Sequence, residues 1–213
     1  MSNANERLAR LEAKAEQLRK DIVVTTEHIG YSHMGGGFSM MEMAVALYYD
    51  FLNWSPEKVD DPDRDRFILS KAHCSETLYT IFSDQGAYTQ DYMVEHFENL
   101  DQYKFGMHSN RKKCPQIEVS AGSLGHGLPI AVGYAMGARV RKENYRVFVM
   151  IGDGEFDEGT NWEALMAGAH YKLNNLVCIL DKNQLQMTGP TEQIMNIDPV
   201  ADKVRAFGWN VIN

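Results

Sequence analysis

Cysteine is scarce in this sequence, with three residues among 213, and the three are far apart. Cys74, Cys114 and Cys178 form no Cys-x-x-Cys pair and are odd in number, so neither a zinc knuckle nor a disulfide framework is indicated. We expect reduced, mostly buried thiols. Positive charge is also in deficit. The 21 basic residues against 29 acidic ones leave a formal charge of −8, which argues against a nucleic-acid partner.

Long apolar runs are missing as well. No segment approaches the ~20 residues that a membrane span requires, and the charged N-terminal segment has no signal-peptide core. We therefore expect a cytoplasmic protein without a membrane partner. An ordinary composition, with 44% hydrophobic residues, six prolines and no fixed-period repeat, predicts a single domain over residues 1–213.

The N-terminal half has helical apolar periodicity. Leucines, alanines and an isoleucine recur at helical spacing, which predicts an amphipathic helical segment at about 5–27. The glycines at 35–37 predict a hinge before a second helix, whose apolar face would carry Met40, Ala44, Leu47 and Phe51. In chain order, we further expect a buried strand at 67–69 and helices at about 74–84, 89–99 and 127–142.

The C-terminal half contains a strand–helix–strand pattern. Residues 147–151 and 176–180 are continuous apolar runs, typical of parallel strands buried on both faces, and 161–171 has helical periodicity. This predicts a doubly wound α/β fold with a mainly parallel sheet flanked by helices. A helix near 198–207 precedes an expected strand at 209–212, where the sequence stops. We therefore expect the domain to be C-terminally incomplete.

Polar residues follow both predicted strands. Gly152-Asp153-Gly154-Glu155 comes after the first, and Asn183 comes shortly after the second. Because ligands of open parallel sheets bind outside the carboxyl ends of the strands, these residues are expected to meet at one site. The two glycines allow a ligand to approach the backbone closely. The positive end of the following helix favours a diphosphate there.

A diphosphate at this edge needs a hard cation. Magnesium prefers oxygen ligands, and Asp153 can supply a carboxylate, Asn183 an amide oxygen and Leu185 a backbone carbonyl. Calcium or manganese could take the same place. The structural alternative is that Asp153 caps a helix and Asn183 shapes a turn.

These residues are similar to the thiamine-diphosphate signature of a large enzyme superfamily. From about residue 20 onward the chain resembles the transketolase family, and less closely deoxyxylulose-phosphate synthase or the alpha subunits of 2-oxo-acid dehydrogenases. The resemblance implies thiamine diphosphate as cofactor and transfer of a two-carbon ketol unit from a ketose phosphate to an aldose phosphate. The discriminating segments are Glu158–Ala164, His170–Leu176 and Phe207–Trp209.

The resemblance also implies roles for individual residues. His33 would face the donor sugar, His73 would lie beside the cofactor, and His108 would lie near the terminal hydroxyls of the substrate. The cofactor would contact His73 and two further sets: Gly122, Ser123 and Leu124 of a glycine loop, and Gly152, Asp153, Gly154, Glu155 and Asn183.

The sequence departs from the family pattern beside these motifs. Ser32, Ala72 and Met107 stand where the family usually has glycine before each histidine, and His126 stands where glutamine is common. Each of the first three adds bulk, which predicts a reshaped donor pocket. An unusual or substituted ketose is one expectation, and an ordinary pentose donor is the other.

A partner chain is implied too. Family members activate the aminopyrimidine with a glutamate from a second domain, usually of a different chain, and Glu158 matches a glutamate linked to it across the interface. Its structural alternative is an acidic residue favoured by a helix N-terminus. We expect the chain to be the N-terminal subunit of a split transketolase, or a piece of a longer one. It would need a C-terminal subunit that supplies the pyrimidine-binding domain. We also expect the chain to self-associate. Two alternatives remain: an alpha-type subunit of another thiamine-dependent enzyme, such as a 2-oxo-acid dehydrogenase, and a non-catalytic cofactor-binding module.

Overall fold

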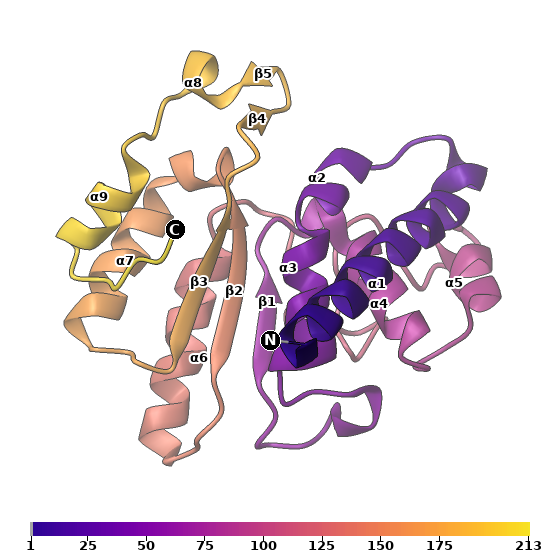
Figure 1. The fold of residues 1–213 in the computed structure, drawn as a ribbon, viewed down its shortest axis with the longest axis horizontal. Coiled ribbons are helices and arrows are strands. Elements are labelled where there is room, and N and C mark those ends of the chain that lie inside the picture. The colour runs from indigo at the N-terminus through magenta and orange to yellow at the C-terminus, as the bar shows by residue number, and fades with distance from the viewer. Residues whose placement is uncertain (1) are drawn as a thin grey trace. The chain divides into compact units, whose positions relative to one another are not determined.

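The computed structural model of the protein describes residues 2–213, with side chains from residue 4 onward. The chain groups into two compact units (Figure 1). The first, called the helical unit below, contains the chain up to residue 64 together with residues 72–120. The second, called the sheet unit, contains residues 65–71 and 121–213. The single domain expected from the sequence stays a prediction.

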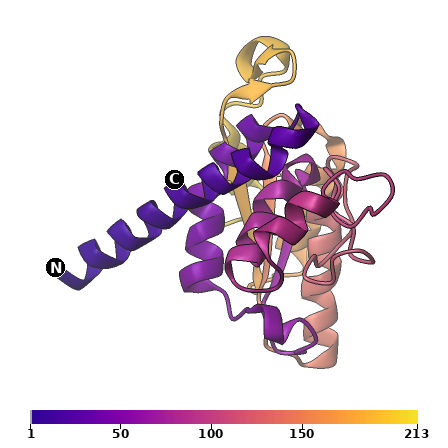
Figure 2. The ribbon, with the colours of Figure 1, turned by 90° about the vertical axis from the view of Figure 1, so that its right-hand side faces the viewer.

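The helical unit is organised around α1, Ser2–Thr26, which confirms the predicted N-terminal helix. Its apolar face buries Ala15, Leu18 and Ile22 against α3, α4 and α5. The N-terminal part of α1 is exposed and extends beyond the other helices of this unit (Figure 2). The remaining elements are η1 Glu27–Ile29, α2 Met34–Ser39, α3 Met41–Ala46, η2 Leu47–Phe51, η3 Pro56–Lys58, η4 Ala72–Cys74, α4 Ser75–Asp84 and α5 Gln90–His96.

The expected glycine hinge is wrong, because residues 35–37 lie inside helix α2. A Cβ atom on Gly37 would lie 2.8 Å from the hydroxyl oxygen of Thr77 on α4. Glycine here therefore serves close helix packing rather than a bend. In the segment that follows, Met40, Ala44 and Leu47 are buried as predicted. Phe51 is 55% exposed, because the chain ends this segment in a π-helical turn that changes the helical period.

The sheet unit contains three parallel strands in the order β1-β2-β3, namely Arg66–Leu69, Val147–Gly152 and Leu176–Asp181. Helix α7, Gly159–His170, connects β2 to β3, as the apolar pattern predicted. Helix α6, Gly127–Arg141, packs on β2 and on α7. The smaller elements are η5 Glu155–Asp157, β4 Leu185–Gln186, β5 Gly189–Pro190, α8 Thr191–Ile194 and α9 Val200–Ala206.

Two predictions for the sheet unit are wrong. Strand β2 is buried throughout its apolar run, but β3 lies at the edge of the described sheet and its Val177 is 41% exposed. Residues 209–212 do not form a strand. Trp209 instead packs on α7, donating its indole N–H to the carbonyl of Leu165 at 2.8 Å, and Ile212 is 90% exposed. The apolar pattern there serves one anchored side chain rather than a strand.

The cysteines agree with the expectation of free thiols, since none is in a disulfide. Cys74 and Cys114 are buried and Cys178 is half-buried. Among the helices of residues 2–213, none combines the length and the apolar character that crossing a membrane demands.

Candidate functional site

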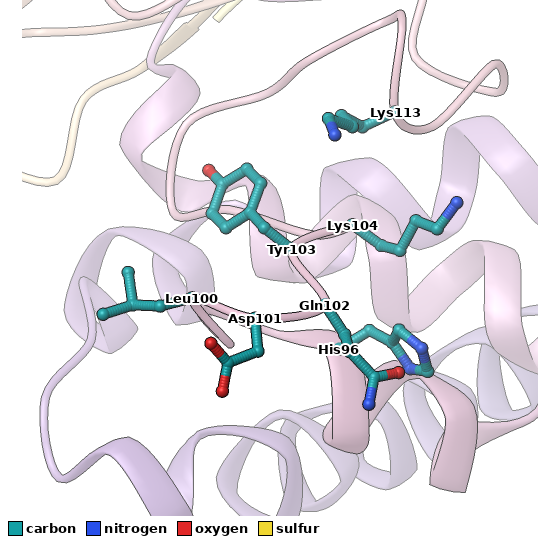
Figure 3. A pocket seen from close by; sticks show the side chains of 7 residues that line it. All are labelled: His96, Leu100, Asp101, Gln102, Tyr103, Lys104 and Lys113. Atoms are coloured by element: carbon teal, nitrogen blue, oxygen red, sulfur yellow. The ribbon is translucent and has the colours of Figure 1, made fainter.

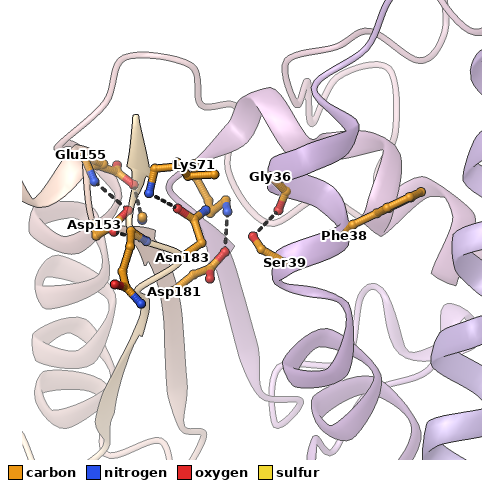
Figure 4. A network of polar contacts seen from close by, with 12 residues as sticks. Gly36, Phe38, Ser39, Lys71, Asp153, Glu155, Asp181 and Asn183 are labelled. Atoms are coloured by element: carbon orange, nitrogen blue, oxygen red, sulfur yellow. Dashed lines mark hydrogen bonds and ion pairs between the residues drawn. The ribbon is translucent and has the colours of Figure 1, made fainter. Parts of the chain in front are cut away.

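The carboxyl ends of β2 and β3 lie side by side in the sheet unit (Figure 4). Gly152 pairs with Asp181, and the next peptide, the N–H of Asp153, donates to the carbonyl of Asp181 at 3.2 Å. Asp153 is also linked to the segment after β3, because one of its carboxylate oxygens accepts from the backbone N–H of Gln184 at 2.7 Å. The structure thus brings together the Gly152–Glu155 turn and the Asn183 turn, as predicted from strand order.

Asp153 is 1% exposed and its carboxylate is held in one orientation. Besides Gln184, it accepts from the backbone N–H of Gly154 at 3.0 Å and from the hydroxyl of Thr191 at 3.2 Å. It does not cap α7, whose N-cap is Glu158. Asp153 thus organises the segment after β3 instead of capping α7, and its carboxylate is fixed at a strand end where a cation could be held. The metal-binding role of Asp153 stays a prediction.

Asn183 does shape a turn, because its side-chain oxygen accepts from the backbone N–H of Leu185 at 2.9 Å. An amide oxygen carries two lone pairs and is one of the oxygen ligands that divalent cations take. Leu185 pairs with Pro190 in the β4–β5 hairpin. Proline has no N–H, so Pro190 cannot donate to the Leu185 carbonyl opposite it. The Asn183 amide and the Leu185 carbonyl are oxygen donors of the kind that the predicted ligand set requires, and their role as ligands stays a prediction.

The charges around this edge also fit a divalent cation. One carboxylate oxygen of Asp157 is buried without a hydrogen-bond partner, while the other accepts from the Gln186 amide at 2.9 Å. Burial raises the pKa of Asp157, and the negative charges of Asp153 and Glu158 raise it further, although the Gln186 bond lowers it. A bound cation would offset this repulsion. Among the described residues, no cluster of three or more His, Cys, Asp or Glu forms a competing metal site.

The glycine loop at 122–127 is tied to the same turn. Gly125 has φ of 81°, and a Cβ there would lie 2.5 Å from Cβ of Glu158, so a side chain would be strained and would collide. The hydroxyl of Thr160 donates to the Gly125 carbonyl at 2.7 Å. Ser123 and Leu124 are exposed at the tip of the loop. Their predicted contact with cofactor rings needs such exposure.

Glu155 is the residue that joins the loop to the turn. Its buried carboxylate accepts from the hydroxyl of Ser70 and from the backbone N–H groups of Gly125 and Gly152, at 2.9 and 3.1 Å for the last two. Burial raises the pKa of Glu155, against the lowering effect of these donors. Since the side chain is fully engaged within the protein, its predicted cofactor contact would have to come from the backbone.

Sequence reasoning missed a buried ion pair beside this edge. The Lys71 ammonium lies 2.6 Å from the Asp181 carboxylate, and both side chains are at most 5% exposed. The two residues are 110 positions apart, and Lys71 follows β1 while Asp181 ends β3. No motif in the sequence links Lys71 to Asp181. The sequence feature that bears on this ion pair is the predicted parallel sheet, because it places the ends of its strands at the same edge.

Breaking this pair is expected to destabilise the fold. Asp181→Ala leaves the Lys71 charge buried without this carboxylate, which typically costs about 3–5 kcal/mol. Urea unfolding should show this loss in the free energy of unfolding. As a control, Asp202→Ala removes the exposed Arg205–Asp202 pair and should cost about 1 kcal/mol or less. Equal effects of the two substitutions would contradict a structural role for the Lys71–Asp181 pair.

The three predicted histidines come together within the helical unit. His33 is the N-cap of α2, His73 lies in η4, and His108 lies in the loop after α5. The ring centroid of His33 is 5.1 Å from that of His73 and 6.4 Å from that of His108. Burial and the neighbouring charge of His108 lower the pKa of His33 from its ordinary 6.5. His33 therefore disfavours folding as the pH falls below about 6.5, because the unfolded chain binds its proton more readily.

Other histidines have structural contacts. His28 contacts the carbonyl of Phe97 at 3.1 Å, and His96 contacts that of Tyr92 at 2.8 Å. His170 ends α7 with its ring against Tyr171. His126 is exposed and contacts the Leu124 carbonyl at 3.1 Å.

The residues before the three histidines differ in where they lie. Ala72 is fully buried, and Met107 is half-buried. Ser32 donates its hydroxyl to Glu76 at 3.2 Å. The expectation that each adds bulk to a donor pocket stays a prediction.

Two open hollows of the helical unit lie elsewhere. One, of about 430 Å³, is lined by residues 96, 100–104 and 113 (Figure 3), and the other has about 510 Å³. Lys104 and Lys113 line both. None of the predicted site residues lines either hollow.

Comparison with known proteins identifies the family. The family model described as "Transketolase, thiamine diphosphate binding domain" matches residues 12–213. One subunit of the apulose-4-phosphate transketolase of Phocaeicola vulgatus is 39% identical over 203 residues, covering 95% of this chain and 71% of that protein. The 6-deoxy-6-sulfo-D-fructose transketolase subunit SqwG of a Clostridium species is 33% identical, covering 94% and 72%.

The fold gives the same result. The crystal structure of transketolase from Campylobacter jejuni superposes with a TM-score of 0.87 at 26% identity, covering 95% of this chain and 32% of that one. The α/β fold and the family model together define a thiamine-diphosphate-binding domain. The chain belongs to the transketolase family and matches its thiamine-diphosphate-binding domain over residues 12–213. It spans about a third of the solved enzyme.

Proposed function

We propose that the protein is the N-terminal subunit of a two-subunit transketolase. It would transfer a two-carbon ketol unit from a ketose phosphate to an aldose phosphate, using thiamine diphosphate and a divalent metal. The observation that carries the proposal is the meeting of Asp153 and Asn183 at one sheet edge in a chain of this family. Two relatives that are named as subunits of apulose-4-phosphate transketolases support a split enzyme.

The residues at the sheet edge would hold the cofactor. Asp153, Asn183 and the Leu185 carbonyl would ligate magnesium, or calcium or manganese, and the N-terminus of α7 favours the diphosphate charge. The exposed loop residues Ser123 and Leu124 would lie against the rings. When bound, thiamine diphosphate supplies a carbanion and an electron sink, and the protein supplies binding, orientation and exclusion of water.

The histidine cluster would handle the substrate protons. His33 and His108 would donate and accept protons at the donor hydroxyls, and His73 would lie nearer the cofactor. Imidazole suits this work because its ordinary pKa is near neutral pH. The lowered pKa of His33 favours the neutral ring, which is the form that can accept a proton.

The deciding experiment is a donor–acceptor screen. The chain would be co-expressed with the product of a neighbouring gene that encodes a pyrimidine-binding domain, and ketol transfer between sugar phosphates would be measured. Apulose 4-phosphate and 6-deoxy-6-sulfo-D-fructose belong in the donor set, since they occur in the names of relatives. Decarboxylation of pyruvate by the complex would instead support a 2-oxo-acid dehydrogenase subunit. Cofactor binding without turnover on any donor would support a non-catalytic module.

Truncating the histidines should separate chemistry from cofactor binding. His33→Ala or His108→Ala is expected to lower turnover of the reconstituted enzyme by ~10²–10⁴, the usual cost of losing a positioned proton-transfer group. Affinity for thiamine diphosphate should stay within a few-fold of wild type. His170→Ala, at a helix end in the sheet unit, is the matched control and should retain activity. Full activity of both active-site variants would return these two histidines to a structural role.

A further inference from the structure

A buried carboxylate lies under the turn that carries His33. Glu76, in the first turn of α4, is 0% exposed, and one of its carboxylate oxygens accepts the hydroxyl of Ser32 at 3.2 Å. Burying a carboxylate is costly unless it is hydrogen-bonded, so such a group is rarely placed in a helix interface without a purpose. Ser32 directly precedes His33 in the chain.

The same carboxylate also lies against the other end of this turn. A Cβ on Gly37 would be 3.4 Å from the Glu76 oxygen that Ser32 contacts, so the α2 backbone passes close by. The N–H of Gly37 donates to the carbonyl of His33 at 3.1 Å. Glu76 therefore bonds to the residue before His33 and lies close to the α2 backbone after it.

His33 depends on its backbone for its orientation. Within the described chain, no side chain hydrogen-bonds its ring, and its ring neighbours are His73 and His108 at centroid distances of 5.1 and 6.4 Å. The imidazole is exposed on its remaining side. Whatever fixes the turn at 32–37 thus also fixes where the ring points.

Ser32 stands where the family that this segment resembles usually has glycine. A chain with glycine at this position would lack the hydroxyl that donates to Glu76. We infer that Glu76 and Ser32 form a positioning pair that holds His33 in the orientation used toward the donor substrate. The catalytic part of this inference rests on the proposed function, whereas the placement of His33 does not.

Breaking the hydrogen bond between Ser32 and Glu76 should change the pKa of His33. Ser32→Ala removes the donor to Glu76, so the turn gains freedom and the ring of His33 can move away from those of His73 and His108. Because partial desolvation and then the neighbouring charge of His108 lower the pKa of His33, a displaced ring should have a pKa nearer its ordinary value. Glu76→Gln keeps an accepting oxygen for Ser32 and should leave the His33 titration close to wild type.

The first measurement is an NMR titration of the histidine ring protons in the full chain without cofactor. Ser83→Ala is the matched control, because it removes another half-buried hydroxyl, one that donates to the Tyr88 carbonyl at 3.2 Å from the last turn of α4. The titrations of His28 and His170 should not move in any variant. A purely structural bond would lower the melting temperature in Ser32→Ala and Ser83→Ala alike without shifting His33.

The second measurement is donor kinetics of the reconstituted complex. A misplaced proton-transfer group can cost about 10- to 100-fold in rate, so Ser32→Ala should lose that much kcat with little change in donor KM. Ser83→Ala should keep wild-type kinetics. An unchanged His33 titration and unchanged kcat in Ser32→Ala would overturn the inference. The two proposals can fail separately. If Ser32→Ala shifts the His33 titration but the wild-type complex transfers no ketol unit, the positioning pair stands and the proposed function is rejected.

Discussion

Replacing Asp153 with alanine is expected to abolish metal-dependent binding of thiamine diphosphate. Asp153 is the only carboxylate in the proposed ligand set, and it is fixed by hydrogen bonds from Gly154, Gln184 and Thr191. Without it the diphosphate charge would be poorly neutralised at a buried edge. Since the loss of residues that merely support a metal ligand typically costs 10–100-fold in affinity, loss of the ligand itself should cost about 100-fold or more.

Calorimetry with thiamine diphosphate and magnesium measures this directly. Asn183→Ala should also bind much more weakly, because it removes the amide oxygen and also releases the turn held by the Leu185 N–H. Asp202→Ala, on the exposed face of α9, is the control and should bind as wild type does. Unchanged affinity in both site variants would remove the metal site from this sheet edge. Circular dichroism of each variant separates loss of the site from loss of the fold.

The sheet edge itself was predictable from the sequence. Two continuous apolar runs separated by a helical pattern require a crossover, and a crossover places both strand ends on one side. Asp153 and Asn183 therefore meet for a reason that local sequence carries. The same reasoning was wrong about β3, because apolar character alone does not distinguish a central strand from one at the edge of the described sheet.

The side chains that organise the site were not predictable. Glu155 joins Ser70 to Gly125 and Gly152, Lys71 meets Asp181, and Glu76 meets Ser32. All but one of these contacts join residues that are at least 30 positions apart. Such contacts depend on packing between elements, for which a single sequence has no periodic signal. The strand predicted at 209–212 is wrong for a related reason. An apolar segment that anchors one Trp on α7 has the same composition as a strand.

The chain alone is expected to show no ketol transfer, even at saturating thiamine diphosphate and magnesium. The resemblance to the family implies that the glutamate that activates the aminopyrimidine comes from a second domain, and relatives of this chain are named as subunits. We propose that Glu158, the exposed N-cap of α7, contacts this partner. Adding a separate chain with the pyrimidine-binding domain should restore activity and tighten cofactor binding, because the cofactor is then held from both ends.

Glu158→Gln should weaken that restoration while leaving diphosphate and metal binding of the isolated chain unchanged. Size-exclusion chromatography should show self-association of the chain alone and a mixed complex after addition. Robust turnover by the isolated chain would show that it carries a complete active site and would contradict the proposed division between two subunits.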